Sequence, residues 1–389
     1  MRKRRFTYLI VLLLFTMGMA ATVSVVRAQQ SFIDLSPRDS IQATVIPALS
    51  YSSDLGFMAG GIFNRYDRQG TVKPFRNHWQ SLSLISTKGY LEFLLRYETT
   101  RTAGTPLRSV FRLDGQRFFQ EQYFGIGNSA AFNEEGWENG FNDFEDRTYA
   151  FTYRGRWPLK KGDKRLEALL QMGIEYHETL ARNDSTLYAF DQPFGSEAGW
   201  FNYLGTGIRY DSRNNEYRPS RGVNLSLRAR WAPDLLSNDY PMSDITLDAS
   251  GYFSFDLYWK WVVATLFVYK QTLGDVPFWN LANVTDGRLL RGYPQNRFIG
   301  NAILAHSLEL RTWFLKWDFY KIRMGAQIFT DRGRVFMDLE EAGELFQDYK
   351  QTVGFGGALS LGSPDFILRM DVGFSKEVYR IYVGIGYAF

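Results

Sequence analysis

The last eleven residues of the chain decide its fold class and read Tyr-Arg-Ile-Tyr-Val-Gly-Ile-Gly-Tyr-Ala-Phe, from Tyr379 to Phe389. Every second residue is large and apolar, and the residues between them are polar or small. Successive side chains of a β-strand point to opposite faces. The pattern therefore predicts a strand over 378–389 with one apolar and one polar face.

The same alternation recurs along the chain, for example at 366–375, 223–231 and 166–177. A soluble β-sandwich alternates too, but here aromatic residues recur near the strand ends, as in the girdles of membrane barrels. We therefore predict an all-β transmembrane antiparallel barrel of about sixteen strands. These are placed at 43–51, 56–66, 75–87, 90–101, 106–116, 146–157, 165–178, 200–212, 222–232, 243–256, 260–271, 303–315, 319–331, 350–361, 365–375 and 378–389.

The connections between these predicted strands alternate in length. Long ones fall at 117–145, 179–199, 272–302 and 332–349, whereas the intervening turns are mostly short, as at Lys160–Lys164, Leu257–Trp259 and Ser363–Pro364. Long extracellular loops and short periplasmic turns are expected of a bacterial outer-membrane barrel whose chain starts in the periplasm.

Residues 1–28 have the pattern of a cleavable signal peptide: a basic start at Arg2–Arg5, an uncharged stretch, and small residues before a cleavage site after Ala28. We expect a short periplasmic tail at 29–42 and the barrel at 43–389. An uncleaved membrane anchor is the alternative, because the uncharged stretch is long enough to span a bilayer.

Composition disfavours several classes of site. The predicted signal peptide holds five of the 45 basic residues and none of the 41 acidic ones, so the remainder carries 40 against 41. No basic stripe for nucleic acid is visible. The absence of Cys removes disulfides and thiolate metal sites. We expect no cofactor and no metal.

Catalysis is not expected either. His306 and Ser307 point to opposite strand faces, which disfavours a lipase-like pair, so the protein is not predicted to be an enzyme. An acidic segment could bind calcium, although a solvated loop is the simpler interpretation. Its acidic residues are Glu134, Glu135, Glu138, Asp143, Glu145 and Asp146.

The C-terminal strand resembles the signal that bacterial barrels present to their assembly machinery, with the matching positions at Tyr382, Gly384, Tyr387 and Phe389. Physically, this is an edge strand offered for β-augmentation. The resemblance implies that the barrel assembly machinery is a partner during biogenesis.

Four further stretches resemble motifs of the BamA/TamA-like outer-membrane family, also called the bacterial surface-antigen family. In chain order they are Tyr123-Phe-Gly-Ile-Gly-Asn128, the turn at 208–223, Arg291-Gly-Tyr293 and Phe329-Thr-Asp-Arg-Gly333. The resemblance implies that the loop carrying Arg291, Gly292 and Tyr293 folds back into the barrel, and that the seam between the first and last strands can open. Characterised assembly factors of the family carry periplasmic POTRA domains. None is expected in this sequence, so their client delivery is not carried over.

Strand parity places Asp331 in the barrel interior with Arg323, Gln327 and Phe329, and places Glu309 and Arg311 there too. A guanidinium in the lumen needs a carboxylate of matching geometry. We therefore hypothesise that Arg291 pairs with Asp331, with Glu309 as a second acceptor, and that Gly333 completes the motif. Ordinary lumenal polar residues are the alternative.

Three functions remain open at this point. The protein could assist insertion or translocation of proteins or other substrates at the outer membrane, form a passive pore, or act as a structural partner of another periplasmic or outer-membrane protein. Its other expected partner is outer-membrane lipid.

Overall fold

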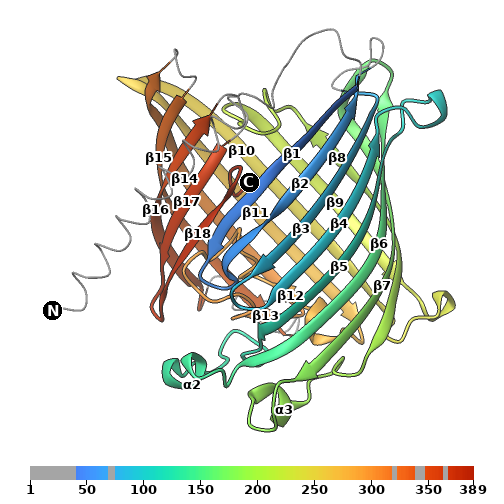
Figure 1. Cartoon of the computed structure of the whole chain (residues 1–389), viewed down its shortest axis with the longest axis vertical. Helices are drawn as coiled ribbons and strands as arrows, with labels where there is room; N and C mark the ends of the chain where they lie inside the picture. Colours follow the sequence, from blue (N-terminus) through green and yellow to red (C-terminus); the bar gives the residue numbers. More distant parts are fainter. Residues whose placement is uncertain (1–40, 69–74, 318–321, 338–346, 362–366) are drawn as a thin grey trace.

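The computed structural model describes residues 41–68, 75–317, 322–337, 347–361 and 367–389. The predicted signal peptide, almost all of the predicted tail, and the turn Ser363–Pro364 lie outside these ranges. In the described part, sixteen strands form a closed antiparallel barrel in which each strand pairs with its sequence neighbours and β1 meets β18 (Figure 1). The predicted fold class and strand number are confirmed.

The barrel strands follow the order of the chain. They are β1 (Ile41–Ser52), β2 (Gly56–Asp67), β3 (Asn77–Ser86), β4 (Tyr90–Thr99), β5 (Arg108–Gln122), β6 (Asp143–Lys160), β7 (Asp163–Ala181), β8 (Gly199–Asp211), β9 (Gly222–Ala232), β10 (Met242–Leu257), β11 (Trp259–Gly274), β14 (Ala302–Trp317), β15 (Ile322–Phe336), β16 (Lys350–Leu361), β17 (Ile367–Phe374) and β18 (Tyr379–Ile385).

Several strands differ in length from the prediction. β5 runs six residues beyond its predicted end at 116 and β15 five residues beyond 331, because both continue past the alternating segment into polar or aromatic sequence near the barrel rim. In β5 the register to β6 also shifts between Phe118 and Glu121, which breaks the strict alternation. β18 ends at Ile385, four residues before the predicted end.

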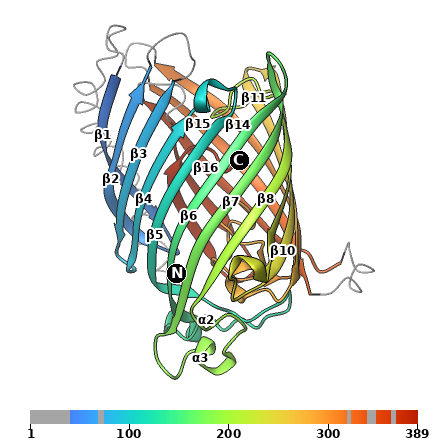
Figure 2. The same ribbon diagram turned by 90° about the vertical axis from the view of Figure 1, so that its right-hand side faces the viewer.

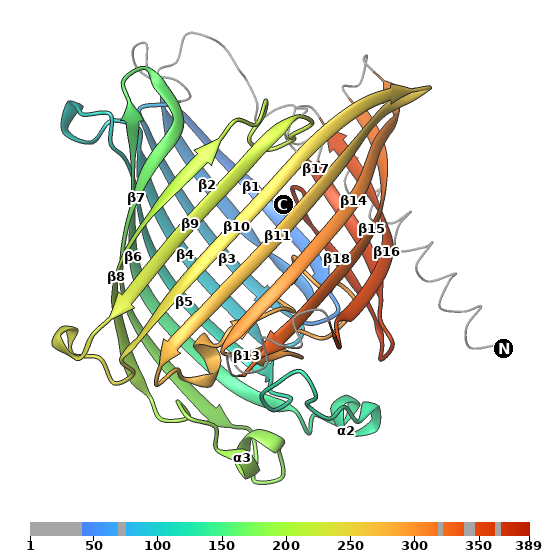
Figure 3. The same ribbon diagram turned by 180° about the vertical axis from the view of Figure 1, so that it is seen from behind.

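The two ends of the barrel differ (Figures 1 and 2). One end, called the loop end here, carries the short helices α2 (Glu134–Glu138) and α3 (Leu187–Asp191) and the small hairpin β12 (Ala282–Asn283) and β13 (Ile299–Gly300). The 3-10 turns η2 (Asp234–Leu236) and η3 (Phe278–Asn280) lie in loop-end connections, and η1 (Thr102–Gly104) in a connection at the other end. That other end, the turn end, has tight links such as Tyr258 alone between β10 and β11. Figure 3 shows these two strands from behind.

The outer face of the barrel is apolar. Val45, Ile174 and Ile328 are each more than half exposed there, at 61%, 53% and 59%. Lipid would cover these side chains, while the alternate residues face an interior rich in Arg, Asp and Glu. Among the described residues, no helix is both long and apolar enough to cross a membrane.

A charge on the outer face should therefore be costly. Leu227 is 46% exposed in the middle of β9. We expect Leu227→Arg to lower the free energy of unfolding by about 2–4 kcal/mol, because the guanidinium would enter the bilayer. Urea unfolding of the protein in lipid vesicles measures this.

The matched control is Thr246→Arg on β10. Thr246 pairs with Arg228 across the β9–β10 ladder and shares the lumenal face with Asp244 and Asp248, so the new cation would lie in the polar interior instead of the bilayer. A cost for Thr246→Arg equal to that of Leu227→Arg would contradict the assignment of the two faces.

Candidate functional site

The connection between β11 and β14, residues 275–301, folds against the inside of the barrel wall. It carries η3 and the β12–β13 hairpin, and its buried side chains Val284, Leu289, Leu290, Tyr293 and Phe298 form one apolar cluster with wall residues. The wall side of this cluster comes from β11, β14 and β15, and consists of Leu266, Val268, Ile303, Ala305 and Val335. Burial of this apolar surface favours the inserted position of the loop.

Arg291 is the charged centre of this folded loop and is fully buried. Its Nε donates to Asp331 Oδ2 at 3.0 Å, its Nη2 donates to Asp331 Oδ1 at 2.8 Å, and its backbone N–H donates to Asp331 Oδ2 at 3.0 Å. The Nη1 atom donates to Glu309 and lies 3.4 Å from Asp371. The guanidinium also lies over the ring of Phe329, 3.7 Å from its centroid, in a cation–π contact.

The surrounding charges balance. Arg311 Nε donates to Glu309 at 2.7 Å, and Arg369 lies 3.3 Å from Asp371, so three arginines face three carboxylates. The acceptors also receive neutral donors, from Ser307 and Thr352 to Asp331 and from Gln327 to Asp371. A buried ion pair is stable only when its remaining hydrogen-bonding groups are also satisfied, and these donors serve that need.

Three glycines, two in the wall and one in the loop, let the loop approach the wall. A Cβ on Gly333 would overlap Cγ2 of Val284, and a Cβ on Gly373 would overlap the carbonyl oxygen of Arg291. Gly292 is equally confined, because a Cβ there would lie 2.9 Å from the backbone carbon of Phe374. Glycine is therefore required at these three positions for Arg291 to lie beside its carboxylates.

The structure brings together all six residues of the hypothesised loop contact: Arg291, Gly292, Tyr293, Glu309, Asp331 and Gly333. It adds Asp371 of β17, which the sequence hypothesis missed. Asp371 lies among the residues of its strand that face the lumen, and the alternation of 366–375 in the sequence already indicated this orientation. Its closeness to Arg291 depends on the curvature of the barrel, which parity does not encode.

The seam between β1 and β18 has a short ladder. Its register pairs are Tyr51↔Val383 and Ser52↔Tyr382, whereas β1 pairs with β2 from Ile41↔Asp67 to Ser52↔Gly56. At the loop end, an ion pair between Arg380 and Asp54 and a hydrogen bond from Ser53 N to Ile381 O at 2.9 Å extend the contact. In the described part of the chain, Ile41–Leu49 has no register partner on β18.

The last four residues leave the sheet, so the predicted continuation of the strand to Phe389 is wrong. Gly386 has a φ of +85°, a left-handed conformation that turns the chain. Tyr387 then lies under the Arg311 guanidinium, 4.0 Å from ring centroid to Cζ, and Phe389 packs against the loop cluster. Tyr387 and Phe389 therefore face the lumen instead of the apolar face, while Tyr382 and Gly384 stay on β18. The C mark lies within the barrel outline (Figures 1 and 3).

The histidines and acidic residues considered from sequence are placed as follows. His306 is exposed on the outer face and contacts Thr265 Oγ1 at 2.8 Å, while Ser307 is buried inside. Glu145 of the acidic segment is paired with Arg117 and Arg147. Within the described ranges, no group of three or more His, Cys, Asp or Glu could hold a metal ion.

A sequence model of the Omp85 superfamily domain matches residues 80–389. The chain belongs to the Omp85 superfamily. Solved structures of similar fold include BamA from Haemophilus ducreyi lacking POTRA domains 1–3, at 16% identity and a TM-score of 0.62 over 90% of this chain and 71% of that one. A search of curated proteins found no match.

CdiB from Acinetobacter baumannii matches at 11% identity with a TM-score of 0.55, and CdiB from Escherichia coli at 10% with 0.58. Each match covers 90% of this chain, but the chain spans 60% and 63% of those proteins. At these identities the likeness shows the fold alone. Membership of the Omp85 superfamily and the closed sixteen-stranded barrel make this chain an integral outer-membrane protein.

The Arg291 contacts in this Omp85 barrel lead to a prediction on the loop. Asp331→Ala would leave a buried guanidinium short of its bidentate partner, at a cost of about 3–5 kcal/mol. We expect trypsin to cleave after Arg291 or Arg297, both buried in the wild type, at least about tenfold faster in the variant.

The matched control is Arg332→Ala, which alters the next residue of β15 on the exposed face. Cleavage of the Asp331→Ala loop at the wild-type rate would show that the apolar cluster alone holds the loop in place.

Proposed function

We propose that this barrel assists the insertion or translocation of protein substrates at the outer membrane through the seam between β1 and β18. The observation that carries this proposal is the short ladder of that seam. The likeness in fold to BamA and CdiB supports the same class of role. Such a role requires no catalytic residue.

The seam offers a template for an incoming strand. Over Ile41–Leu49, β1 pairs with β2 on one side, which leaves the backbone groups of its other edge without a register partner among the described residues. An unpaired edge binds an extended segment by adding it to the sheet. A substrate strand could therefore pair with β1 after a small displacement of β18.

Contacts from the folded loop restrain that displacement. Tyr382 Oη on β18 donates to the carbonyl oxygen of Tyr293 at 3.4 Å. Arg311 joins the Glu309 carboxylate to the ring of Tyr387. The folded loop thereby contacts β18 through Tyr382, and the charge network around Arg291 reaches the segment after β18 through Tyr387. A substrate or partner that moves the loop would also loosen the seam. Barrel assembly machinery and periplasmic or outer-membrane proteins are the partners that this role would involve.

A cysteine pair tests the seam directly, because the chain contains no Cys. Tyr51 and Val383 are direct register partners, so Tyr51→Cys/Val383→Cys can form a disulfide across the seam. In cells with this variant as the sole copy, we expect oxidation to remove the same outer-membrane proteins that depletion removes, and reduction to restore them. Quantitative proteomics of outer membranes provides the measurement.

The control pair is Leu49→Cys/Ala59→Cys, which links β1 to β2 at another register position and leaves the seam free. If the oxidised seam variant supported an unchanged outer membrane while crosslinking was complete, opening of the seam would not be part of the function.

The folded loop also distinguishes this role from a passive pore. Because the loop cluster packs across the lumen side of β11, β14 and β15, we expect the wild-type protein in planar bilayers to stay closed or flicker. Asp331→Ala should raise the frequency of large openings. Large, stable openings of the wild type at low voltage would favour the pore instead.

A further inference from the structure

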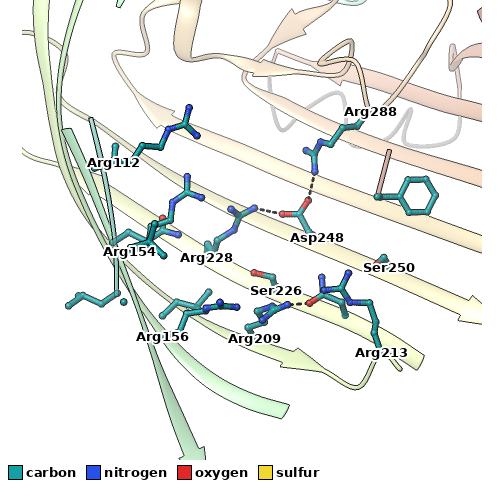
Figure 4. Close-up of a pocket in the computed structure, with 18 of the residues that line it drawn as sticks. Arg112, Arg154, Arg156, Arg209, Arg213, Ser226, Arg228, Asp248, Ser250 and Arg288 are labelled. Atoms are coloured by element: carbon teal, nitrogen blue, oxygen red, sulfur yellow. Dashed lines mark hydrogen bonds and ion pairs between the residues drawn. The ribbon is translucent and has the colours of Figure 1, made fainter. Parts of the chain in front are cut away.

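A polar cavity of about 530 Å³ lies inside the barrel between the folded loop and the turn end (Figure 4). Its lining runs from Arg288 of the loop to Arg213 in the β8–β9 connection at the turn end. One acidic side chain, that of Asp248, is among the lining residues, against eight arginines. These are Arg96, Arg112, Arg154, Arg156, Arg209, Arg213, Arg228 and Arg288. Phe389 also lines the cavity, and its carbonyl oxygen accepts from Arg311 Nη2 at 3.3 Å.

Carboxylates of the wall neutralise part of this charge. Glu167 lies 3.2 Å from Arg209 and 3.9 Å from Arg156, Asp211 lies 2.9 Å from Arg213, and Asp248 pairs with Arg228. Further pairs join Arg96 to Glu98, Arg112 to Asp114, Arg209 to Asp211, and Arg288 to both Asp286 and Asp248. A guanidinium has five N–H donors, and a bidentate pair uses two of them. The others remain available to a ligand in the cavity.

Arg154 of β6 is different, because its side chain has no hydrogen bond or ion pair with any described residue and is exposed to the cavity. The charged and titratable side chains that act on it are Tyr203 and the cations Arg228, Arg112 and Arg230. Figure 4 shows Arg154 beside Arg228 and below Arg112, all reaching into the same space. Like charges that share one cavity repel one another, so an anion bound there would stabilise this cluster of arginines.

We propose that this cavity binds a small anion carrying two or more phosphate groups, with Arg154 as its central contact. The guanidinium fork matches phosphate oxygens in a bidentate arrangement. The volume lies in the range of small-molecule sites. A cleft lined by one sign of charge also concentrates counter-ions from solution.

The site goes beyond the proposed role of the seam and does not depend on it. The phosphates can belong to a soluble polyphosphate or to the headgroup of an anionic lipid, because both present the same oxygens to the arginines. Arg288 of the folded loop lines one side of the cavity, and Arg213 of the β8–β9 connection lines the other.

Isothermal titration calorimetry of the purified protein in neutral detergent tests the site. One arm titrates inorganic tripolyphosphate and a second titrates short-chain phosphatidic acid below its micelle concentration, so the tighter ligand identifies the source. We expect Arg154→Gln to raise the Kd of that ligand about tenfold, as the loss of a charged hydrogen bond does. Added NaCl should weaken binding.

The matched control is Arg165→Gln at the β6–β7 turn, where Arg165 is exposed and paired with Asp163 outside the cavity. Because Arg154 has no partner in the wall, its substitution leaves the wall ion pairs intact, and unchanged mobility on unheated gels verifies folding. Absence of binding in both arms, or equal loss in Arg154→Gln and Arg165→Gln, would overturn the proposal. Tighter binding of an oligoglutamate peptide than of tripolyphosphate would also overturn it.

Discussion

The contact on which this barrel depends is that of one buried guanidinium with carboxylates from three strands. Arg291 reaches Glu309 on β14, Asp331 on β15 and Asp371 on β17, and Thr352 of β16 donates to the same Asp331. Four consecutive strands next to the seam thus converge on a single loop residue. A charge so deeply buried is tolerable only with this set of partners, which makes the position of the loop specific.

The Arg291 contact connects the folded loop inside the barrel with the seam between β1 and β18. The loop covers apolar wall positions, Arg311 extends the charge network to the inward-turned C-terminus, and Tyr293 meets Tyr382 on β18. The seam itself has little ladder of its own. Its closure therefore relies on side chains and on the loop, whereas every other neighbouring pair is held by a longer backbone ladder. This difference in pairing is what the proposed opening at the seam between β1 and β18 requires.

The sequence predicted the strands because a lipid-facing side and a polar lumen impose a period of two on every strand. It also predicted that Arg291, Asp331 and Glu309 meet, since parity and the resemblance to a known loop motif agreed. It missed the turn at Gly386, because an alternating pattern continues through Tyr387 and Phe389 and only tertiary contacts with Arg311 favour the inward path. The arginine cavity was also missed, since its members come from many strands. The apolar contact between the folded loop and the wall did leave a signal in the sequence. β11 is apolar on both faces, and Val262, Ala264, Leu266 and Val268 on its inner face are buried.

If the Arg291 contacts hold the loop in the lumen of the membrane-embedded protein, the amides of this loop are protected from solvent. Hydrogen–deuterium exchange of the wild type in lipid nanodiscs measures this directly, because the Arg291 backbone N–H donates to Asp331. We expect the amides around Arg291 to exchange over hours, like those of the barrel strands. Exchange within seconds, at the rate of an exposed loop, would contradict it.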